Sequence, residues 1–258
     1  MKILITGATG RIGKILRERL SDHQLRLLGR SEVEDPGNAE THIADITDLD
    51  SLRPAFRNID AVIHLAAASA VDSKWEQVLP ANIVGVRNVY EAARLEGVGR
   101  VVYASTTHTV AGHERAAAPA LYELDATTTF PVDVEPRPDS LYGASKVFGE
   151  ALGRWYVDVH GLRVICLRIG YVSGEDDEDF ESPYEGEERL DRRELATRKR
   201  MRAIWLSHRD CVELFRRALV ADVDWAIVYG TSANPRQIWD LAPARRLLGY
   251  QPRDSAPE

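Results

Sequence analysis

The sequence has few cysteines, only two among 258 residues. Cys166 and Cys211 form no Cys-x-x-Cys pair and lie in no His-rich stretch. A disulfide framework and a zinc site both need closely spaced ligands of that kind, so neither is indicated and we predict no metal site. Because both cysteines have apolar neighbours in the sequence, we expect them to pack in the core.

Long apolar runs and an excess of positive charge are also missing. No run reaches 18 apolar residues, and the apolar start of "MKILITGATG" ends at a glycine, too early for a signal peptide. The chain has 40 acidic residues against 33 lysines and arginines, which gives a formal net charge of -7. Such a surface repels nucleic acids and anionic membranes on average. We therefore expect a soluble cytoplasmic protein that binds neither.

The rest of the composition is typical of one globular domain. Hydrophobic residues make up 44% of the chain and charged residues 28%. A chain of this length can bury a core of its own. The sequence shows no internal repeat and no linker between independent domains, so we expect residues 1–258 to form a single domain.

Short apolar runs alternate with segments of helical periodicity along the chain. Strands buried on both faces read as continuous apolar runs, and their alternation with helices implies right-handed crossovers. The pattern therefore predicts an α/β fold with a doubly wound parallel sheet. The expected strands lie at 2–6, 25–29, 41–45, 61–67, 100–106, 162–170 and 225–230, and the clearest helices at 48–57, 75–96, 141–160 and 208–220.

Two segments depart from this alternation. Residues 112–139 contain four prolines and a "TTT" run, which predicts a long loop over the carboxyl end of the sheet. Residues 171–203 include the acidic run "EDDED" and end in the basic "RKRMR". This charge pattern indicates either a solvated excursion or a lid whose basic end faces a negative substrate.

Glycines at positions 7, 10 and 13 lie in "TGATGRIG", directly between the first strand and the first helix. They permit a tight turn, a close approach of backbone to a pyrophosphate, and close helix–strand packing, respectively. The helix N-terminus adds free N–H groups and a partial positive charge. This context predicts a dinucleotide-binding core at residues 1–170, with a small substrate-binding portion at 171–258 that carries the last strand and helix.

The end of the second strand indicates which dinucleotide binds. Folds that bind NAD place an acidic side chain on the ribose about 20 residues beyond the glycine loop, whereas "LLGRSEV" offers Gly29 and Arg30. An arginine suits a 2′-phosphate, so the sequence favours NADP, with NAD as the second choice. Arg11 is a candidate second cation. In the alternative interpretation Arg30 is a solvated strand-end residue and Glu32 binds the ribose.

Tyr142 lies four positions before Lys146 in "SLYGASKVFGE". On a helix the two side chains share a face and can act on one ligand. Removing hydride from a carbinol carbon requires a base for the hydroxyl proton, and a free tyrosine with a pKa of ~10 is a poor base at neutral pH. A nearby ammonium and a positive nicotinamide are expected to lower that pKa. Tyr142 is therefore the candidate base, although the pair taken alone also arises by chance.

Taken in order, "TGATGRIG", "HLAA", Asn82, the hydroxyls of "ASTT" and "YGASK" resemble the extended type of the short-chain dehydrogenase/reductase superfamily. The resemblance covers almost the whole chain. The stretches "ASTTHT", "RPDSLYGASKVFGE" and "RMRAIWLSHRD" are most similar to uronate dehydrogenases, which oxidise the anomeric carbon of galacturonate or glucuronate to a lactone. The resemblance implies a Rossmann sheet, an NAD(P)-dependent oxidoreductase acting on the anomeric or secondary carbinol of a sugar acid, and a homo-oligomer that pairs through the helices at 75–96 and 141–160.

The resemblance also implies the residues of the reaction and of the cofactor site. Thr106 would hold the substrate oxygen beside Tyr142, and Lys146 would bind the nicotinamide ribose. Thr107 is the alternative hydroxyl, because the register is ambiguous by one residue. The implied cofactor contacts are Gly7, Thr9, Gly10, Arg11, Ile12, Gly13, Arg30, Ser31, Asp45, Ile46, Leu65, Ala66, Ala67, Asn82, Tyr142, Lys146 and Ile169.

Substrate contacts are implied for Ser69, Thr107, His108 and Arg200. Arg200 is the expected clamp on a uronate carboxylate through a bidentate fork. Three of these residues have a structural alternative: Ser69 as a helix cap, His108 as the partner of a loop carbonyl, and Arg200 as one more exposed charge.

The chain departs from uronate dehydrogenases at three places that bear on specificity. It has Gly29 and Arg30 in place of an acidic strand end, Tyr171 in place of a small polar residue, and Thr107 in place of an asparagine. Substrate and cofactor preference therefore stay open. Two other functions are also open: a nucleotide-sugar epimerase or dehydratase of the same superfamily, and an NADP-sensing protein without catalysis. The intact "YGASK" argues against the sensor.

Overall fold

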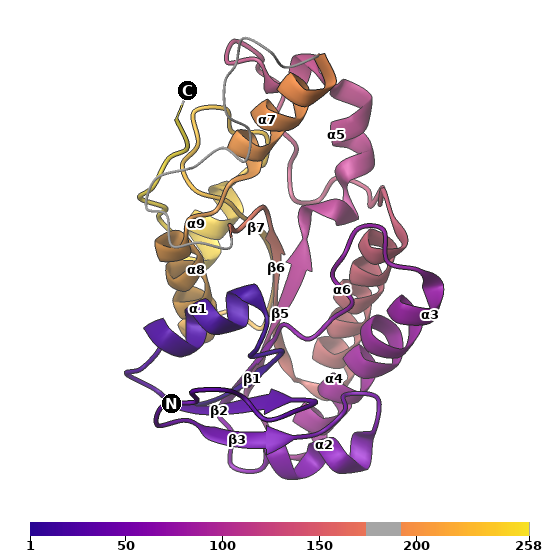
Figure 1. Ribbon diagram of the computed structural model, residues 1–258, viewed down its shortest axis with the longest axis vertical. Coiled ribbons are helices and arrows are strands. Elements are labelled where there is room, and N and C mark those ends of the chain that lie inside the picture. The colour runs from indigo at the N-terminus through magenta and orange to yellow at the C-terminus, as the bar shows by residue number, and fades with distance from the viewer. Residues whose placement is uncertain (174–191, 258) are drawn as a thin grey trace.

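The computed structural model describes residues 1–173 and 192–257 (Figure 1). In this part of the chain, one 7-stranded sheet has the strand order β3-β2-β1-β4-β5-β6-β7, and every neighbouring pair is parallel. The predicted doubly wound parallel sheet is confirmed. The strands are β1 Lys2–Thr6, β2 Gln24–Gly29, β3 Glu40–Ile43, β4 Ala61–His64, β5 Arg100–Thr106, β6 Arg163–Ile169 and β7 Trp225–Gly230.

Helices cover both faces of the sheet. Their bounds are α1 Arg11–Arg19, α2 Leu49–Phe56, α3 Trp75–Val78, α4 Val86–Leu95, α5 Ala111–Ala117, α6 Leu141–His160, α7 Arg192–Ile204, α8 His208–Val220 and α9 Ala242–Leu248. Helices α1, α8 and α9 lie on one face, and α2, α4 and α6 lie on the other (Figure 1). Each layer therefore buries one side of every central strand.

Two apolar cores lie on opposite sides of the sheet. Ile3 and Ile5 of β1 contribute to the core beneath α1, α8 and α9, which also contains Cys211. Leu4, which points the other way, contributes to the core beneath α2, α4 and α6 together with Cys166. Both cysteines are buried, as predicted. A strand covered on both faces would bury a polar side chain on either face, which is unfavourable. This explains the continuous apolar runs in the sequence.

The strand order reverses direction between β1 and β4. Strand β1 pairs with β2 on one side and with β4 on the other. In doubly wound sheets ligands bind outside the carboxyl ends of the strands at such a point. The glycine loop directly follows β1, so the fold places it at this position.

Two predicted segments differ in the structure. Residues 112–139 are not one long loop, because "AGHERAA" is rich in good helix formers and forms α5, followed by a 3-10 turn at Ala120–Tyr122. The predicted helix at 75–96 consists of α3, a π-helical segment at Leu79–Gly85, and α4. Pro80 lies at the start of that π-helical segment, where it has no N–H to continue the α-helical pattern.

The charged segment at 171–203 is described only in part. Its acidic run lies outside the described residues, and its basic end forms α7. Helix α7 lies near α5, beyond the carboxyl ends of β5 and β6 (Figure 1). The division into a core at 1–170 and a small portion at 171–258 stays a prediction.

Within the part of the chain that the structure describes, no helix has both the length and the apolar character that a bilayer crossing requires.

Candidate active site

A cleft of about 1070 Å³ opens at the carboxyl ends of the strands, beside the point where the strand order reverses. The glycine loop, the loops after β3 and β4, the end of β5 and the start of α6 all contribute to it. Most of the predicted site residues line it, namely Gly7, Thr9, Gly10, Arg11, Ile12, Gly13, Arg30, Asp45, Ile46, Leu65, Ala66, Ala67, Ser69, Thr106, Tyr142, Lys146 and Ile169. The lining does not include Ser31, Asn82, Thr107, His108 or Arg200.

The glycine loop joins β1 to α1 in a tight turn that has no room for a side chain at Gly7 or Gly13. Gly7 has a left-handed φ of 71°, and a Cβ there would lie 2.7 Å from the Ala66 backbone nitrogen. A Cβ on Gly13 would lie 2.5 Å from the Gly7 carbonyl oxygen. Helix α1 begins directly after the loop, and its first turn has no acidic residue to repel an anion. These residues fit the pyrophosphate of a dinucleotide.

Charged side chains meet at the end of the cleft formed by β2 and β3. Arg30 lines the cleft directly after β2. The Asp45 carboxylate accepts hydrogen bonds from the Thr47 N–H at 2.9 Å and hydroxyl at 2.8 Å, and these bonds, with the Arg30 charge, hold the pKa of Asp45 below its usual range. Arg11 Nη1 donates to the Val172 carbonyl at 2.7 Å. Arg11 is thus tied to the segment after β6, whereas Arg30 lies on the β2 side.

Helix α6 brings Tyr142 and Lys146 to the cleft beside Thr106, the last residue of β5. The Ser140 hydroxyl caps this helix by accepting a hydrogen bond from the Gly143 N–H at 3.0 Å. The helix therefore begins directly before the tyrosine. Lys146 Nζ lies 5.8 Å from the centroid of the Tyr142 ring. The three side chains predicted to be catalytic thus lie together.

Burial determines the acidity of Tyr142. It raises the pKa of this phenol to about 12, although a hydrogen bond with Thr106 acts in the opposite direction. The sequence predicts that the nearby ammonium and a nicotinamide lower this pKa, whereas in the protein alone the shift has the opposite sign. Additional positive charge in the cleft is needed before the phenolate is favoured.

The Lys146 ammonium is buried but has two local partners. Nζ donates to the Ala104 carbonyl at 2.8 Å and lies 4.8 Å from the centroid of the Tyr103 ring, within cation–π range. Burial lowers the pKa of Lys146 to about 8, and the Glu150 charge is among those that oppose the shift. The ammonium form therefore prevails at pH 7.

A buried ion pair that the sequence does not reveal supports the end of β5. Arg168 donates through Nε and Nη2 to the two Glu150 carboxylate oxygens, both at 2.9 Å, and the Ser105 hydroxyl donates to Oε1 at 2.6 Å. Ser105 precedes Thr106, and Glu150 lies one helical turn after Lys146. The Glu150 carboxylate therefore joins β5 and β6 to α6, next to Thr106 and Lys146. The i+4 spacing from Lys146 is the sequence signal that could have found Glu150.

Asn82 affects the cleft through the residues that it binds. Its Oδ1 accepts from the Ala68 N–H at 2.7 Å, and its Nδ2 donates to the Ala68 carbonyl at 3.0 Å and to the Ser145 hydroxyl at 2.9 Å. These bonds join the loop after β4 to α6. Asn82 therefore positions lining residues, whereas the resemblance implies a direct cofactor contact.

The predicted substrate residues are separated in the structure. Ser69 lines the cleft, whereas Thr107 is buried with 1% exposure. His108 Nδ1 lies 3.0 Å from each carboxylate oxygen of Asp139, and the His108 ring centroid lies 6.0 Å from that of Tyr142. His108 thus bonds a carboxylate, not the loop carbonyl of the alternative interpretation, and lies next to the cleft tyrosine.

Arg200 is held in an ion pair. Its Nε and Nη2 donate to Glu114 Oε1 and Oε2 at 2.7 and 3.3 Å, and the side-chain exposures are 25% for Arg200 and 1% for Glu114. The interpretation of Arg200 as a solvated surface charge is therefore wrong. Its carboxylate partner in the structure is a residue of this chain.

Other lining residues are not among the predicted contacts, although the sequence analysis noted Gly29 and Tyr171 as departures that bear on specificity. Most of them neighbour a predicted residue or follow a strand end, which is the signal that could have found them. The two polar residues of α3, Glu76 and Gln77, carry no such signal. The set comprises Leu28, Gly29, Ala44, Thr47, Ala68, Ala70, Glu76, Gln77, Pro80, Ala81, Ala104, Ser105, Gly170, Tyr171 and Val172.

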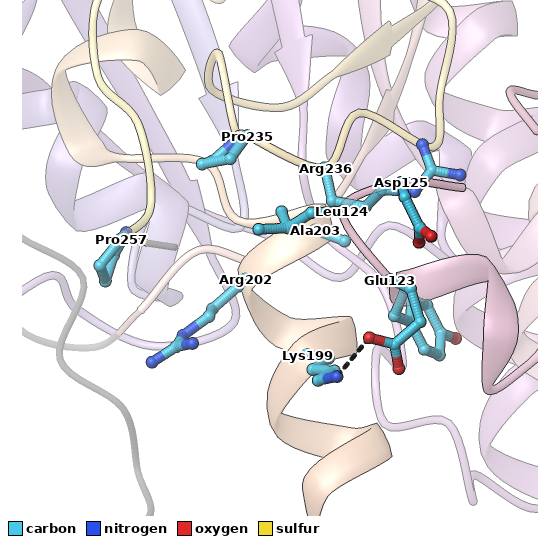
Figure 2. Close-up of a pocket in the computed structure, with 10 residues that line it drawn as sticks. Glu123, Leu124, Asp125, Lys199, Arg202, Ala203, Pro235, Arg236 and Pro257 are labelled. Carbon is cyan, nitrogen blue, oxygen red and sulfur yellow. Dashed lines mark hydrogen bonds and ion pairs between the residues drawn. The ribbon is translucent and has the colours of Figure 1, made fainter. Parts of the chain in front are cut away.

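A second pocket, of about 360 Å³, lies between α7, the segment after α5 and the C-terminal residues (Figure 2). Lys199 and Glu123 form an ion pair at its edge, with Nζ and Oε2 2.6 Å apart. Arg236 in its wall donates to the Leu121 and Thr128 carbonyls, among others. These charged groups already bind other groups of the protein. The pocket is not lined by any residue of α6, the helix that carries Tyr142 and Lys146.

The chain matches a known protein family and is similar to known sugar dehydrogenases. Residues 3–192 match the NAD dependent epimerase/dehydratase family. The chain is 40% identical to L-arabinose 1-dehydrogenase (NAD(P)(+)) of Haloferax volcanii, over 99% of this chain and 97% of that protein. It is 36% identical to the NAD-dependent glucose-6-phosphate dehydrogenase of the same organism, over 99% and 94%.

A solved structure with the same fold contains a bound cofactor. It is a mutant uronate dehydrogenase from Agrobacterium tumefaciens complexed with NAD, which is 33% identical and has a TM-score of 0.79 over 98% of this chain and 85% of that chain. The predicted resemblance to uronate dehydrogenases is therefore confirmed.

Proposed function

The chain belongs to the NAD dependent epimerase/dehydratase family, and on that premise we propose that it is an NAD(P)-dependent dehydrogenase of the anomeric hydroxyl of a sugar or sugar acid. The observation that carries this proposal is the meeting of Tyr142, Lys146 and Thr106 in the cleft that the glycine loop also lines. The relatives act on L-arabinose, glucose 6-phosphate and uronate. All three are named as dehydrogenases of a sugar, and the three sugars differ in charge.

The geometry supports different roles for the side chains that meet in the cleft. A nicotinamide bound in the cleft would accept the hydride. Tyr142 takes the hydroxyl proton, and Thr106 holds the substrate oxygen by a hydrogen bond. Because burial raises the pKa of Tyr142 to about 12, the protein alone keeps this phenol protonated at neutral pH. Tyr142 therefore becomes an effective base only in the loaded cleft, where positive charges surround it.

Within this proposal the cofactor is NADP in preference to NAD. Arg30 lines the cleft directly after β2, at the place where this fold binds the 2′-position of the ribose. Glu32, the alternative ribose ligand, is not among the lining residues. A guanidinium at that position favours a phosphate over a hydroxyl.

Absorbance at 340 nm tests the activity with aldoses, uronates, nucleotide sugars and simple secondary alcohols, each with NAD and NADP. Net formation of NAD(P)H with an aldose or a uronate supports the proposal. Turnover of a nucleotide sugar without net NAD(P)H would instead identify an epimerase or dehydratase. Cofactor binding without turnover of any substrate would identify a sensor.

Tyr142→Phe tests the assignment of the base. It should retain cofactor binding and lose turnover by roughly 10²- to 10⁴-fold, the usual contribution of a general base. Tyr156→Phe is the matched control, because Tyr156 lies on the same helix and its hydroxyl donates to Glu91 at 2.9 Å, outside the cleft lining. Equal turnover losses in the two variants would contradict the role of Tyr142.

A further inference from the structure

The Arg200 guanidinium binds a carboxylate within the protein. Its bidentate contact with Glu114, at 2.7 and 3.3 Å, has the fork geometry that arginine uses to bind a carboxylate ligand. The Tyr122 hydroxyl donates at 2.7 Å to Glu114 Oε1, the oxygen that Arg200 Nε also contacts. Glu114 thus has two partners and 1% exposure, so its carboxylate is held firmly in this position.

The pair is outside the lining of the cleft, but the end of α7 connects it to the catalytic end. Helix α7, which carries Arg200, ends at Ile204, whose carbonyl accepts a hydrogen bond at 2.8 Å from the N–H of Tyr171, a cleft-lining residue. Helix α5, which carries Glu114, faces α7 in Figure 1. Both helices lie beyond the end of β5, the strand that places Thr106 in the cleft.

A second buried acid, Asp139, is connected to the cleft tyrosine through His108. Asp139, whose side chain is 3% exposed, contacts His108 at 3.0 Å and Arg115 Nη2 at 3.1 Å. His108 in turn neighbours Tyr142, with ring centroids 6.0 Å apart. Burial lowers the pKa of the Arg200 guanidinium, but the Glu114 carboxylate outweighs this effect and the net shift is upward. The Asp139 charge acts in the same direction as Glu114.

Two buried carboxylates therefore act on the Arg200 guanidinium, Glu114 through the bidentate contact and Asp139 through its charge. A substrate carboxylate at the same place would have to displace Glu114, which would leave an unpaired buried charge. Alternatively it would share the guanidinium with Glu114, and like charges at close range repel. An uncharged hydroxyl or hydrogen at that end of the sugar neither displaces Glu114 nor repels it.

We propose that Glu114 is a specificity-determining residue that occupies the Arg200 fork, so that the enzyme prefers an uncharged aldose to a uronate or a sugar phosphate. This inference rests on the proposed function and narrows it to one substrate class. It assigns Arg200 a role in holding Glu114 and the α5–α7 contact, in place of the carboxylate clamp that the family resemblance implies.

Matched sugars test the preference. D-galactose and D-galacturonate differ only at C6, as do D-glucose and D-glucuronate, and L-arabinose lacks that carbon. Wild-type kcat/KM should be at least roughly tenfold higher for the better aldose than for its uronate, since a charge-assisted hydrogen bond to the substrate is missing. A higher kcat/KM for the uronates would overturn the inference and leave the proposed function intact. The absence of NAD(P)H formation with any sugar would overturn both.

Glu114→Gln tests the residue itself. The amide keeps the shape and the contact with Tyr122 but removes the charge, so the uronate-to-aldose ratio of kcat/KM should rise by roughly tenfold. Glu123→Gln is the control: it removes the same charge from the Lys199 pair at the second pocket (Figure 2) and should leave the ratio unchanged. Tyr122→Phe, which releases one bond to Glu114 and is milder for folding, should shift the ratio in the same direction by a smaller factor. An unchanged ratio in folded Glu114→Gln, or in Tyr122→Phe if the former does not fold by circular dichroism, would refute the inference.

Discussion

Lys146→Met should stabilise the free protein while abolishing its proposed activity. The folded structure buries this ammonium and lowers its pKa from 10.5 to about 8. At pH 7 the lysine is charged in both the folded and the unfolded chain, and the folded chain bears the cost of keeping the charge away from water. Methionine has a similar length and no charge, so the substitution removes that cost.

The magnitude follows from the pKa difference. At 1.36 kcal/mol for each pKa unit, the shift from 10.5 to about 8 corresponds to about 3 kcal/mol. The variant loses the hydrogen bond to the Ala104 carbonyl, which contributes about 1 kcal/mol, and the cation–π contact with Tyr103, which contributes about 0.5–1 kcal/mol. The net gain at pH 7 is about 1–2 kcal/mol, a rise in Tm of roughly 3–6 °C for a chain of this size.

The sign of the pH dependence distinguishes this explanation from ordinary repacking. Between pH 8 and 10.5 the unfolded wild-type chain binds more protons at Lys146 than the folded one, so wild type gains stability relative to the variant as the pH rises through this window. Urea unfolding at pH 7 and 10.5 measures the difference. Lys199→Met, at an exposed position on α7, is the control and should change stability by less than about 0.5 kcal/mol. A Lys146→Met variant less stable than wild type at pH 7, or a difference independent of pH, would refute the reasoning.

Three further predictions follow from the cleft and the outer surface. Gly13→Ala should destabilise the fold by about 1–3 kcal/mol and weaken NADP binding, measured by thermal melting and calorimetry, because its Cβ would lie 2.5 Å from the Gly7 carbonyl; unchanged binding would contradict it. Arg30→Asp should weaken NADP relative to NAD by roughly tenfold to a hundredfold, and an unchanged Kd ratio would exclude a contact with the 2′-phosphate. Trp155 is 47% exposed on α6, one of the helices predicted to pair, so Trp155→Glu should convert the predicted homo-oligomer to monomers in analytical ultracentrifugation; an unaltered sedimentation coefficient would count against that surface.

The parts of the site that were predictable are those fixed by local sequence. The glycine loop follows from the steric limits of one tight turn, and Gly7 and Gly13 indeed have no room for a Cβ. The shared face of Tyr142 and Lys146 follows from the helical repeat alone. The sheet was predictable because strands buried on both faces must be continuously apolar, which is a property of each short segment taken by itself.

The parts that were not predictable depend on contacts between distant segments. Arg200 meets Glu114 across 86 positions, and nothing near either residue identifies its partner. The sequence predicts that the Lys146 ammonium and a bound nicotinamide together lower the pKa of Tyr142, whereas in the protein alone burial raises it. Burial is a property of the assembled fold, so a sequence pattern that identifies neighbouring charges does not reveal it.

The Asn82 side chain has a consequence for how the cleft responds to its ligands. Because it binds both Ala68 and Ser145, it joins the loop after β4 directly to the helix that carries the tyrosine and the lysine. Under the proposed function, we therefore expect a substitution of this amide to alter dinucleotide affinity and turnover together.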